Sequence, residues 1–386
     1  MATVSQIYGI VNDCAKEAYG EQAISVKDTA SLVSLGSKVF SSDTDKDLFY
    51  HALLDRVGRT AIAARKYYGK KRSVKRDELD WGIVYQKISY KQRDAVKNFS
   101  WDSSNNPSPY EITQQTEAVQ KLFSVMGTYE YNDRIPDYQL FTSFSGAAQM
   151  GAYISGIFIN QNNALEKAEE ELGKLAVNTL IAGVFIKGKE NQARNALAEY
   201  NTRFSKSLTA AACMTDPDFL KYLTREILMA KNNMSEYTVN FNITDDIPRF
   251  TPEDKCVVEV LGQFASASKT YLQADTYHDE MVHLPRYEEV NCWQSPGTSF
   301  AFEDVSKIYV KNAELAVSGN SQGVCEQSGI IAVIRDYDAA ASIIYRRRSH
   351  SMYDPRNEEY IVEEKADTGY MVDLSENAVV FYVADP

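Results

Sequence analysis

The sequence is poor in cysteine and proline, and it has no long apolar run. Its five cysteines are scattered and never form a C-x-x-C pair, so their spacing predicts neither a disulfide framework nor a zinc site. No stretch approaches the roughly 20 apolar residues that a membrane-spanning helix needs. Residues 1–8 also lack the basic and apolar regions of a secretory signal. We therefore expect a reduced, cytoplasmic chain without a membrane partner.

An excess of basic charge is also missing. The chain has 41 lysines and arginines against 53 acidic residues, a formal net charge of -12. This balance argues against a protein whose main role is to bind nucleic acid through its phosphates, although weak local contacts remain compatible with it. A length of 386 residues, 44% of them hydrophobic, is enough for two or three domains with a sizeable core.

The common catalytic motifs are absent as well. The sequence contains no G-x-S-x-G elbow, no G-x-x-x-x-G-K-[ST] loop and no G-x-G-x-x-G after a predicted strand. His278 and His283 are five residues apart, so they lie about 140° apart around a helix and do not share a face as zinc-binding histidines do. Cys256 falls in an apolar strand, where a cysteine usually acts as a small buried hydrophobe. We predict no catalytic residue, metal or cofactor.

The clearest predicted element is a long helix from about Ser145 to Ile181. Its apolar residues recur at steps of three and four, and its other face carries Glu166 and Glu169 to Glu171. At about 1.5 Å per residue it would span on the order of 50 Å, as a support across a flat subunit. Coiled-coil pairing is the alternative, which Gly151, Gly156 and Gly173 disfavour.

A long two-stranded excursion is predicted before this helix. A basic run begins at Arg65, a strand follows from Trp81 to Tyr90, residues 100–109 are rich in turn formers, and a second strand covers Val119 to Tyr131. An isolated ribbon of two strands is marginally stable in water. We therefore expect it to lie on another domain or another subunit.

The remaining segments predict an α+β chain. Residues 1–39 are interpreted as an arm, followed by a helix from Asp45 to Ala64. Asp216 is a predicted helix N-cap with Pro217 at the first helical position. Strands are predicted near residues 256–261, 288–293, 330–335, 342–346 and 379–383.

Two basic clusters and two tryptophans are the candidate contact residues. Basic clusters can touch nucleic acid, but in an acidic chain they serve equally well to pair with acidic patches of a neighbouring copy. We predict contacts between subunits for Arg65, Lys70, Arg72, Arg76, Trp81, Trp101, Arg346, Arg347 and Arg348.

Several segments together resemble a known family. They are LLDRVGRT from Leu53 to Thr60; Trp81, Gly82, Ile83, Val84 and Gln86; Phe141 to Met150 leading into Gly151, Ala152, Tyr153 and Ile154; and, at the end, Ile330 to Asp336 and Tyr370 to Asp385. In this order they resemble the major capsid proteins of tailed phages and prophages of Gram-positive bacteria, including short-tailed phages.

This resemblance implies the Hong Kong 97 capsid fold. The expected parts are an N-terminal arm and first helix in residues 1–64, an extended β-loop in 65–136, a spine helix with peripheral domain in 137–190, and an axial α+β domain with closing peripheral strands in 191–386. It implies a non-enzymatic protein that assembles with itself into hexamers and pentamers of an icosahedral shell around packaged double-stranded DNA, which it contacts weakly.

The resemblance also implies partners and a location. About sixty residues precede the loop, too few for the long scaffolding segment of some relatives, so a separate scaffolding protein is expected, together with a portal protein. The chain would be assembled in the host cytoplasm and reside in the virion. Two alternatives stay open, an encapsulin-like nanocompartment shell and a cytoplasmic thiol hydrolase using Cys256.

Overall fold

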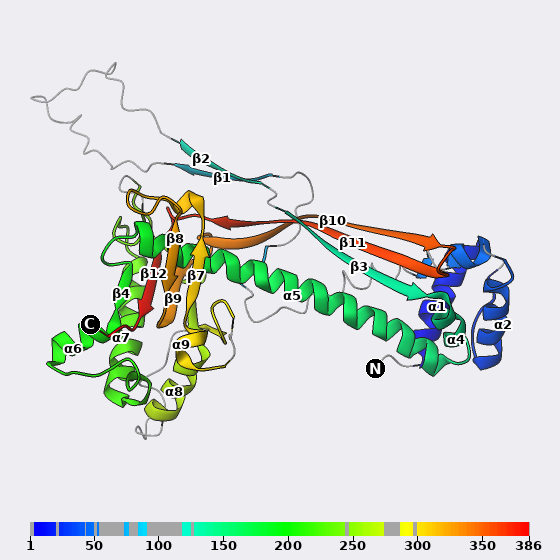
Figure 1. Ribbon diagram of the computed structural model, residues 1–386, viewed down its shortest axis with the longest axis horizontal. Helices are drawn as coiled ribbons and strands as arrows, with labels where there is room; N and C mark the ends of the chain where they lie inside the picture. The colour runs from blue at the N-terminus through cyan, green and yellow to red at the C-terminus, as the bar shows by residue number, and fades with distance from the viewer. Residues whose placement is uncertain are drawn as a thin grey trace, which may run out of the picture.

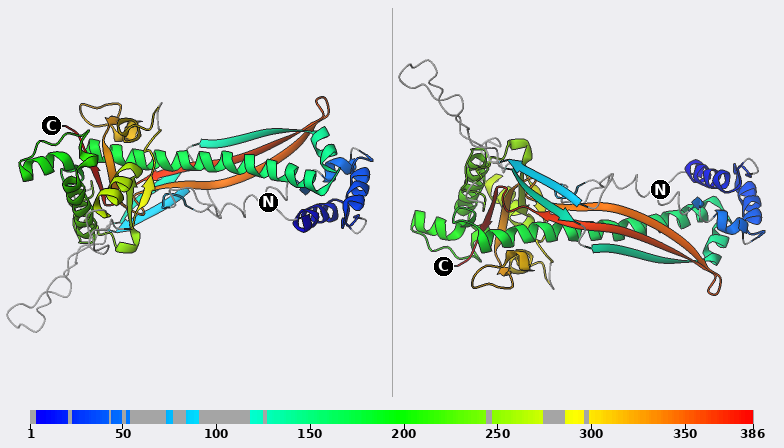
Figure 2. Two further views of the ribbon diagram at one scale, coloured as in Figure 1. Left: turned by 90° about the horizontal axis from the view of Figure 1, so that it is seen from below. Right: turned by 90° about the horizontal axis from the view of Figure 1, so that it is seen from above.

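An elongated molecule results from one long helix that joins an α+β body to a distant cluster of short helices (Figures 1 and 2). The computed structural model describes residues 4–20, 23–42, 44–49, 52–53, 73–76, 84–90, 118–124, 127–243, 247–273, 286–295 and 299–385. The long helix is α5 (Ala147–Lys187), and its 41 residues span about 60 Å.

Helix α5 confirms the predicted long helix and continues to Lys187 rather than ending near Ile181. Residues 176–184 are all buried, because this end of the helix enters the body and is covered on every side. A helix segment buried all round carries apolar residues all round. The one-sided apolar pattern therefore ends where the helix enters the body, although the helix itself continues to Lys187.

The body is built on a five-stranded sheet in the order β4-β12-β9-β5-β6. Its strands are β4 (Ala193–Asn195), β5 (Cys256–Leu261), β6 (Glu288–Val290), β9 (Ile330–Asp336) and β12 (Ala378–Tyr382). Alternate side chains divide between two cores. Ala332 and Ile334 pack under the helices α6 (Ala196–Phe204), α7 (Pro217–Met234) and α8 (Gly262–Gln273). Val333 packs toward α5 on the other face.

Helix α7 begins where its sequence predicts. The Asp216 carboxylate accepts hydrogen bonds from the backbone N–H groups of Asp218 and Phe219, and Pro217 occupies the first turn. The predicted apolar stripe of this helix is buried, namely Leu220, Leu223, Ile227 and Ala230. On the α5 side, a small sheet of β7 (Ile308–Lys311) and β8 (Val324–Gln327) and the short helix α9 (Phe302–Val305) complete the body.

A long antiparallel hairpin runs beside α5, away from the body (Figure 1). It consists of β10 (Ala340–Asp354) and β11 (Glu359–Val372), and β3 (Gly127–Pro136) pairs with β11 as a third strand. The predicted strands 342–346 and 119–131 are therefore wrong in extent. Strand β10 is much longer, and residues 118–136 form two strands with different partners, β2 (Ala118–Ser124) and β3.

The first fifty residues fold onto their own chain wherever the structure describes them. Helices α1 (Val4–Tyr19), α2 (Thr29–Val39) and α4 (Asp137–Ser143), with residues 44–49, gather beside the tip of the hairpin (Figure 2). Their shared core contains Val11, Leu32, Phe49, Leu140 and Tyr360. These helices form a packed cap on the far end of the hairpin, so the segment predicted as an arm packs on its own chain where the structure describes it. Of the predicted helix from Asp45 to Ala64, residues 44–49 and 52–53 are helical and the rest lies outside the described residues.

Strands β1 (Val84–Tyr90) and β2 form the predicted ribbon as a separate two-stranded antiparallel sheet. The ribbon lies beside the base of the β10–β11 hairpin, at the opposite end of the molecule from α1 and α2 (Figures 1 and 2).

Candidate subunit-contact surface

The segment 73–76, which precedes the ribbon, is fixed to the body by a buried ionic network. The backbone N–H and the hydroxyl of Ser73 donate to the carboxylate of Glu288 at 3.0 and 2.8 Å. The same hydroxyl accepts a 2.7 Å hydrogen bond from Arg335, whose Nε lies 2.9 Å from Glu259 Oε1. Arg335 and Glu259 are completely buried. Burial raises the pKa of Glu288 above its usual value.

Lys75 and Arg347 meet on the spine helix. Lys75 Nζ lies 2.8 Å from Glu166 and 3.4 Å from Glu169, and the guanidinium of Arg347 pairs with Glu169 as well. The backbone supports this junction, because Ser342 of β10 exchanges hydrogen bonds with Val74 and Arg76. The acidic face of α5 therefore receives basic residues of its own chain here.

Arg76 is also held within the subunit. Its guanidinium stacks on the Tyr337 ring at 3.6 Å, donates to the Tyr337 carbonyl at 2.5 Å and lies 3.4 Å from Asp338. Burial lowers its pKa. Arg348 is paired similarly, 2.6 Å from Asp367 on the neighbouring strand.

The remaining predicted contact residues divide into two groups. Arg346 is exposed and has no ion-pair partner among the residues that the structure describes. The other five lie outside the described residues, namely Arg65, Lys70, Arg72, Trp81 and Trp101.

One face of the β1–β2 ribbon lies on the hairpin. Tyr85 and Phe123, which are cross-strand partners, pack against Ile343 and Tyr345 of β10. The Tyr345 hydroxyl donates a 2.9 Å hydrogen bond to the Phe123 carbonyl. At the next pair on this face, Lys87 and Lys121 both reach the carboxylate of Asp373. Sequence reasoning missed this site, since nothing local links residue 373 to either lysine.

The opposite face of the ribbon is apolar and uncovered in the isolated chain. Val84 is 43% exposed, Ile88 50%, Leu122 61% and Tyr90 64%. They share this face with Gln86 and Gln120, because side chains two residues apart along a strand point the same way. Large apolar side chains gathered on one exposed face mark an interaction surface.

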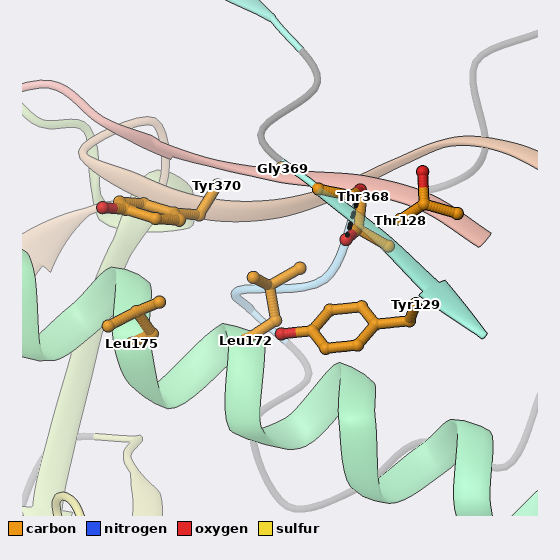
Figure 3. Close-up of a pocket in the computed structure, with 8 residues that line it drawn as sticks. Thr128, Tyr129, Leu172, Leu175, Thr368, Gly369 and Tyr370 are labelled. Carbon is orange, nitrogen blue, oxygen red and sulfur yellow. Dashed lines mark hydrogen bonds between the residues drawn. The ribbon is translucent and has the colours of Figure 1, made fainter. Parts of the chain in front are cut away.

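A second concave surface lies between α5 and the hairpin (Figure 3). This cavity of about 260 Å³ is lined mainly by Tyr129, Leu172, Leu175 and Tyr370, with small residues of β3 and β11 at its edge. Tyr129 and Leu175 are 43% and 42% exposed. It offers an apolar groove on the side of the spine helix.

Of the groups considered for catalysis, the structure describes Cys256, a half-buried thiol. Burial raises the pKa of Cys256 to about 11, so almost none of this thiol is the reactive thiolate at neutral pH. His278 and His283 lie outside the described residues. Among the described residues, no three His, Cys, Asp or Glu side chains are grouped as a metal site. No helix in the described part of the chain is long and apolar enough to cross a membrane.

Solved phage structures share this fold. A chain of the capsid structure of Staphylococcus phage Andhra superposes with a TM-score of 0.52 at 10% identity, over 82% of this chain and 85% of that one. A chain from the structure of the head fiber and inner core protein of native bacteriophage P68 gives 0.51 at 9% identity, over the same shares. These matches confirm the predicted α+β fold of the Hong Kong 97 type.

The sequence itself supplies the family. Comparison with curated proteins finds no significant match. A family model described as the Phi29-like phage major capsid protein matches residues 11–382, nearly the whole chain. The role that this family implies is structural, a shell-forming protein of the virion that assembles with itself. The chain therefore belongs to the Phi29-like phage major capsid proteins.

Proposed function

We propose that copies of this chain form the hexamers and pentamers of an icosahedral shell, and that the outer face of the β1–β2 ribbon is a main contact between them. The observation that carries this proposal is the row of Val84, Ile88, Tyr90 and Leu122, exposed on a ribbon only two strands wide. Covering such a face with a second copy removes its apolar side chains from water, which favours the contact.

The groove beside Leu175 supports a second contact of the same kind. It is apolar, open and built on rigid elements, because α5 and the β3–β11 pair form its walls. Exposed tyrosines such as Tyr129 suit subunit interfaces, since they bury apolar area and keep a polar tip. Among the predicted contact residues, Arg346 remains a candidate on the edge strand of the hairpin.

We further propose that the shell holds double-stranded DNA through weak contacts. The net charge of -12 supports this, because an acidic wall does not retain a polyanion. Several described basic side chains are also already occupied within the subunit, among them Lys75, Arg76, Arg347 and Arg348. The same proposal includes a separate scaffolding protein, a portal protein and assembly in the host cytoplasm. It also divides the chain into an N-terminal arm with a first helix (1–64), an extended β-loop (65–136), a spine helix with peripheral domain (137–190) and an axial domain with closing peripheral strands (191–386).

A paired set of double variants tests the ribbon contact. Ile88→Glu with Leu122→Glu places two charges on the outer face and removes two apolar side chains. Gln86→Ser with Gln120→Ser changes two polar side chains on the same face and leaves its apolar residues and its charge unchanged. Burying one Ile or Leu contributes about 1.5–3 kcal/mol at each contact. We expect the first pair to reduce the assembled fraction more than tenfold and the second pair to assemble.

The readout is negative-stain electron microscopy and size-exclusion chromatography, with and without a candidate scaffolding protein. Circular dichroism shows whether both pairs remain folded. Closed shells from Ile88→Glu with Leu122→Glu, in the same yield as the parent, would refute the ribbon contact.

A further inference from the structure

The docked face of the ribbon contains an arrangement that is unfavourable by itself. Lys87 of β1 and Lys121 of β2 stand directly opposite each other in the register. Like charges at directly opposed positions of an antiparallel pair destabilise it. The ribbon therefore needs a counter-charge at this level.

Asp373 supplies that counter-charge from another part of the fold. Its side chain is completely buried, and each of its oxygens takes one lysine. Lys121 Nζ lies 2.5 Å from Oδ1, and Lys87 Nζ lies 2.7 Å from Oδ2. One carboxylate thus joins both strands of the ribbon to the end of β11.

The carboxylate is itself rigidly held. The backbone N–H of Ser375 donates to Oδ1 at 3.0 Å, and the Asp373 N–H donates to the Ala339 carbonyl at 2.8 Å. The turn after Asp373 is fixed to the body, where the Asn377 side chain donates to the Thr251 hydroxyl at 3.2 Å. Any movement of the two lysines is therefore movement relative to the body.

Other charged groups complete the cluster. Glu376 lies 2.8 Å from Lys87 and 3.7 Å from Arg249 of the body, and the Asp338 carbonyl accepts from Lys87 at 3.3 Å. Burial alone raises the pKa of Asp373, but the two lysines outweigh it and hold that pKa well below its usual value. We call Asp373 with Lys87 and Lys121 the latch, and its carboxylate is ionised throughout the neutral range.

We infer that Asp373 fixes the direction in which the β1–β2 ribbon leaves the subunit, before any neighbouring copy binds. Tyr85 with Phe123 and Lys87 with Lys121 are successive pairs on the same face. One attachment would act as a hinge, whereas two successive attachments define a direction. The significance of that direction for assembly rests on the proposed function, in which the outer face of the ribbon meets the next copy.

Spin-label distances in the unassembled subunit test this inference. One label is placed at Gln120→Cys on the outer face of the ribbon and the other at Met229→Cys, an exposed position on α7 of the body. The native cysteines are buried or half-buried, and the parent chain without introduced cysteines gives the labelling background. In the Asp373→Asn variant we expect the distance distribution to become at least twofold broader.

Two further variants keep the test decisive. Lys121→Met removes one lysine of the latch without disturbing the buried carboxylate, and we expect an intermediate broadening from it even if Asp373→Asn folds poorly. Lys365→Met removes a lysine of similar exposure that pairs with Glu130 and Glu363 on the hairpin, and we expect the parent distribution. Distributions for Asp373→Asn and Lys121→Met that superimpose on the parent would overturn the inference.

The assembled fraction of Asp373→Asn separates this inference from the proposed function. If Asp373→Asn broadens the spin-label distance distribution but forms shells in full yield, the role of Asp373 is supported and the ribbon is not the shell contact. If Asp373→Asn keeps the parent's narrow distance distribution but fails to assemble, the inference about Asp373 is refuted and the proposed ribbon contact is not.

Discussion

Two antiparallel β structures meet at the base of the spine helix, and they are built very differently. The hairpin β10–β11 has a third strand, a helix along one side and ion pairs to that helix, such as Arg347 with Glu169. The ribbon β1–β2 has two strands, one docked face and one bare apolar face. The hairpin is stabilised within the subunit, whereas the bare face of the ribbon is the one that we propose to contact another copy.

The largest effect is expected from the network that holds the body. Arg335→Ala breaks the completely buried ion pair with Glu259, and breaking a buried pair by removing one member typically costs about 3–5 kcal/mol. We expect the urea midpoint of the unassembled subunit to fall accordingly. Arg348→Ala, which breaks a more exposed pair with Asp367 on the hairpin, should cost no more than about 1 kcal/mol. Equal losses from the two variants would contradict the distinction between body and surface.

An intermediate effect is expected where the two β structures touch. A Cβ atom at Gly369 would lie 2.9 Å from the Tyr345 ring and 3.0 Å from the Ser124 carbonyl of the ribbon. Gly369→Ala should therefore destabilise the subunit by about 1–3 kcal/mol through overpacking. Gly127→Ala, in open space on β3, is the matched control. Thermal unfolding followed by circular dichroism measures the stability of both variants. If Gly369→Ala leaves the stability unchanged, the contact between the ribbon and the hairpin accommodates the added methyl group without cost.

The smallest effect is a pH dependence of the latch. The pKa of Asp373 in the folded subunit is depressed below its ordinary value of 3.8, so its contribution to stability is present above pH 3.8 and is lost as the pH falls toward the folded pKa. Over that pH range the free energy of unfolding of the parent falls by about 1.4 kcal/mol per pH unit relative to that of Asp373→Asn. Urea unfolding of both chains between pH 6 and pH 3 measures this difference. A constant difference across the range would mean that Asp373 is not paired in the folded subunit.

Local chemistry made part of the fold predictable from the sequence. The cap at Asp216 and the apolar steps along α5 involve residues within a few positions of each other, and both are confirmed. Strand β10 was underestimated because residues 346–351 are polar on both faces, so this part of the strand lacks the alternation of polar and apolar residues that marks a half-buried strand. The split of residues 118–136 depends on two different partners, which no local pattern encodes.

The contact residues were harder to predict, for a related reason. A basic cluster signals charge but not the partner that neutralises it. Arg76 pairs with Asp338 and Arg347 with Glu169, residues far away in the sequence. The apolar row at Ile88 and Leu122 was overlooked because its meaning depends on which face of the ribbon is docked. All nine predicted contacts between subunits stay predictions, namely Arg65, Lys70, Arg72, Arg76, Trp81, Trp101, Arg346, Arg347 and Arg348.

The cap of helices at the far end of the hairpin has a consequence for synthesis on the ribosome. The Tyr360 hydroxyl donates a 2.9 Å hydrogen bond to Asp47, which lies 313 residues earlier in the chain. At roughly 5–20 residues per second, the first helices wait about 15–60 s for the strand that completes their core. A nascent chain therefore cannot complete this cap of helices, or enter a shell with the cap folded, until the ribosome has passed Tyr360.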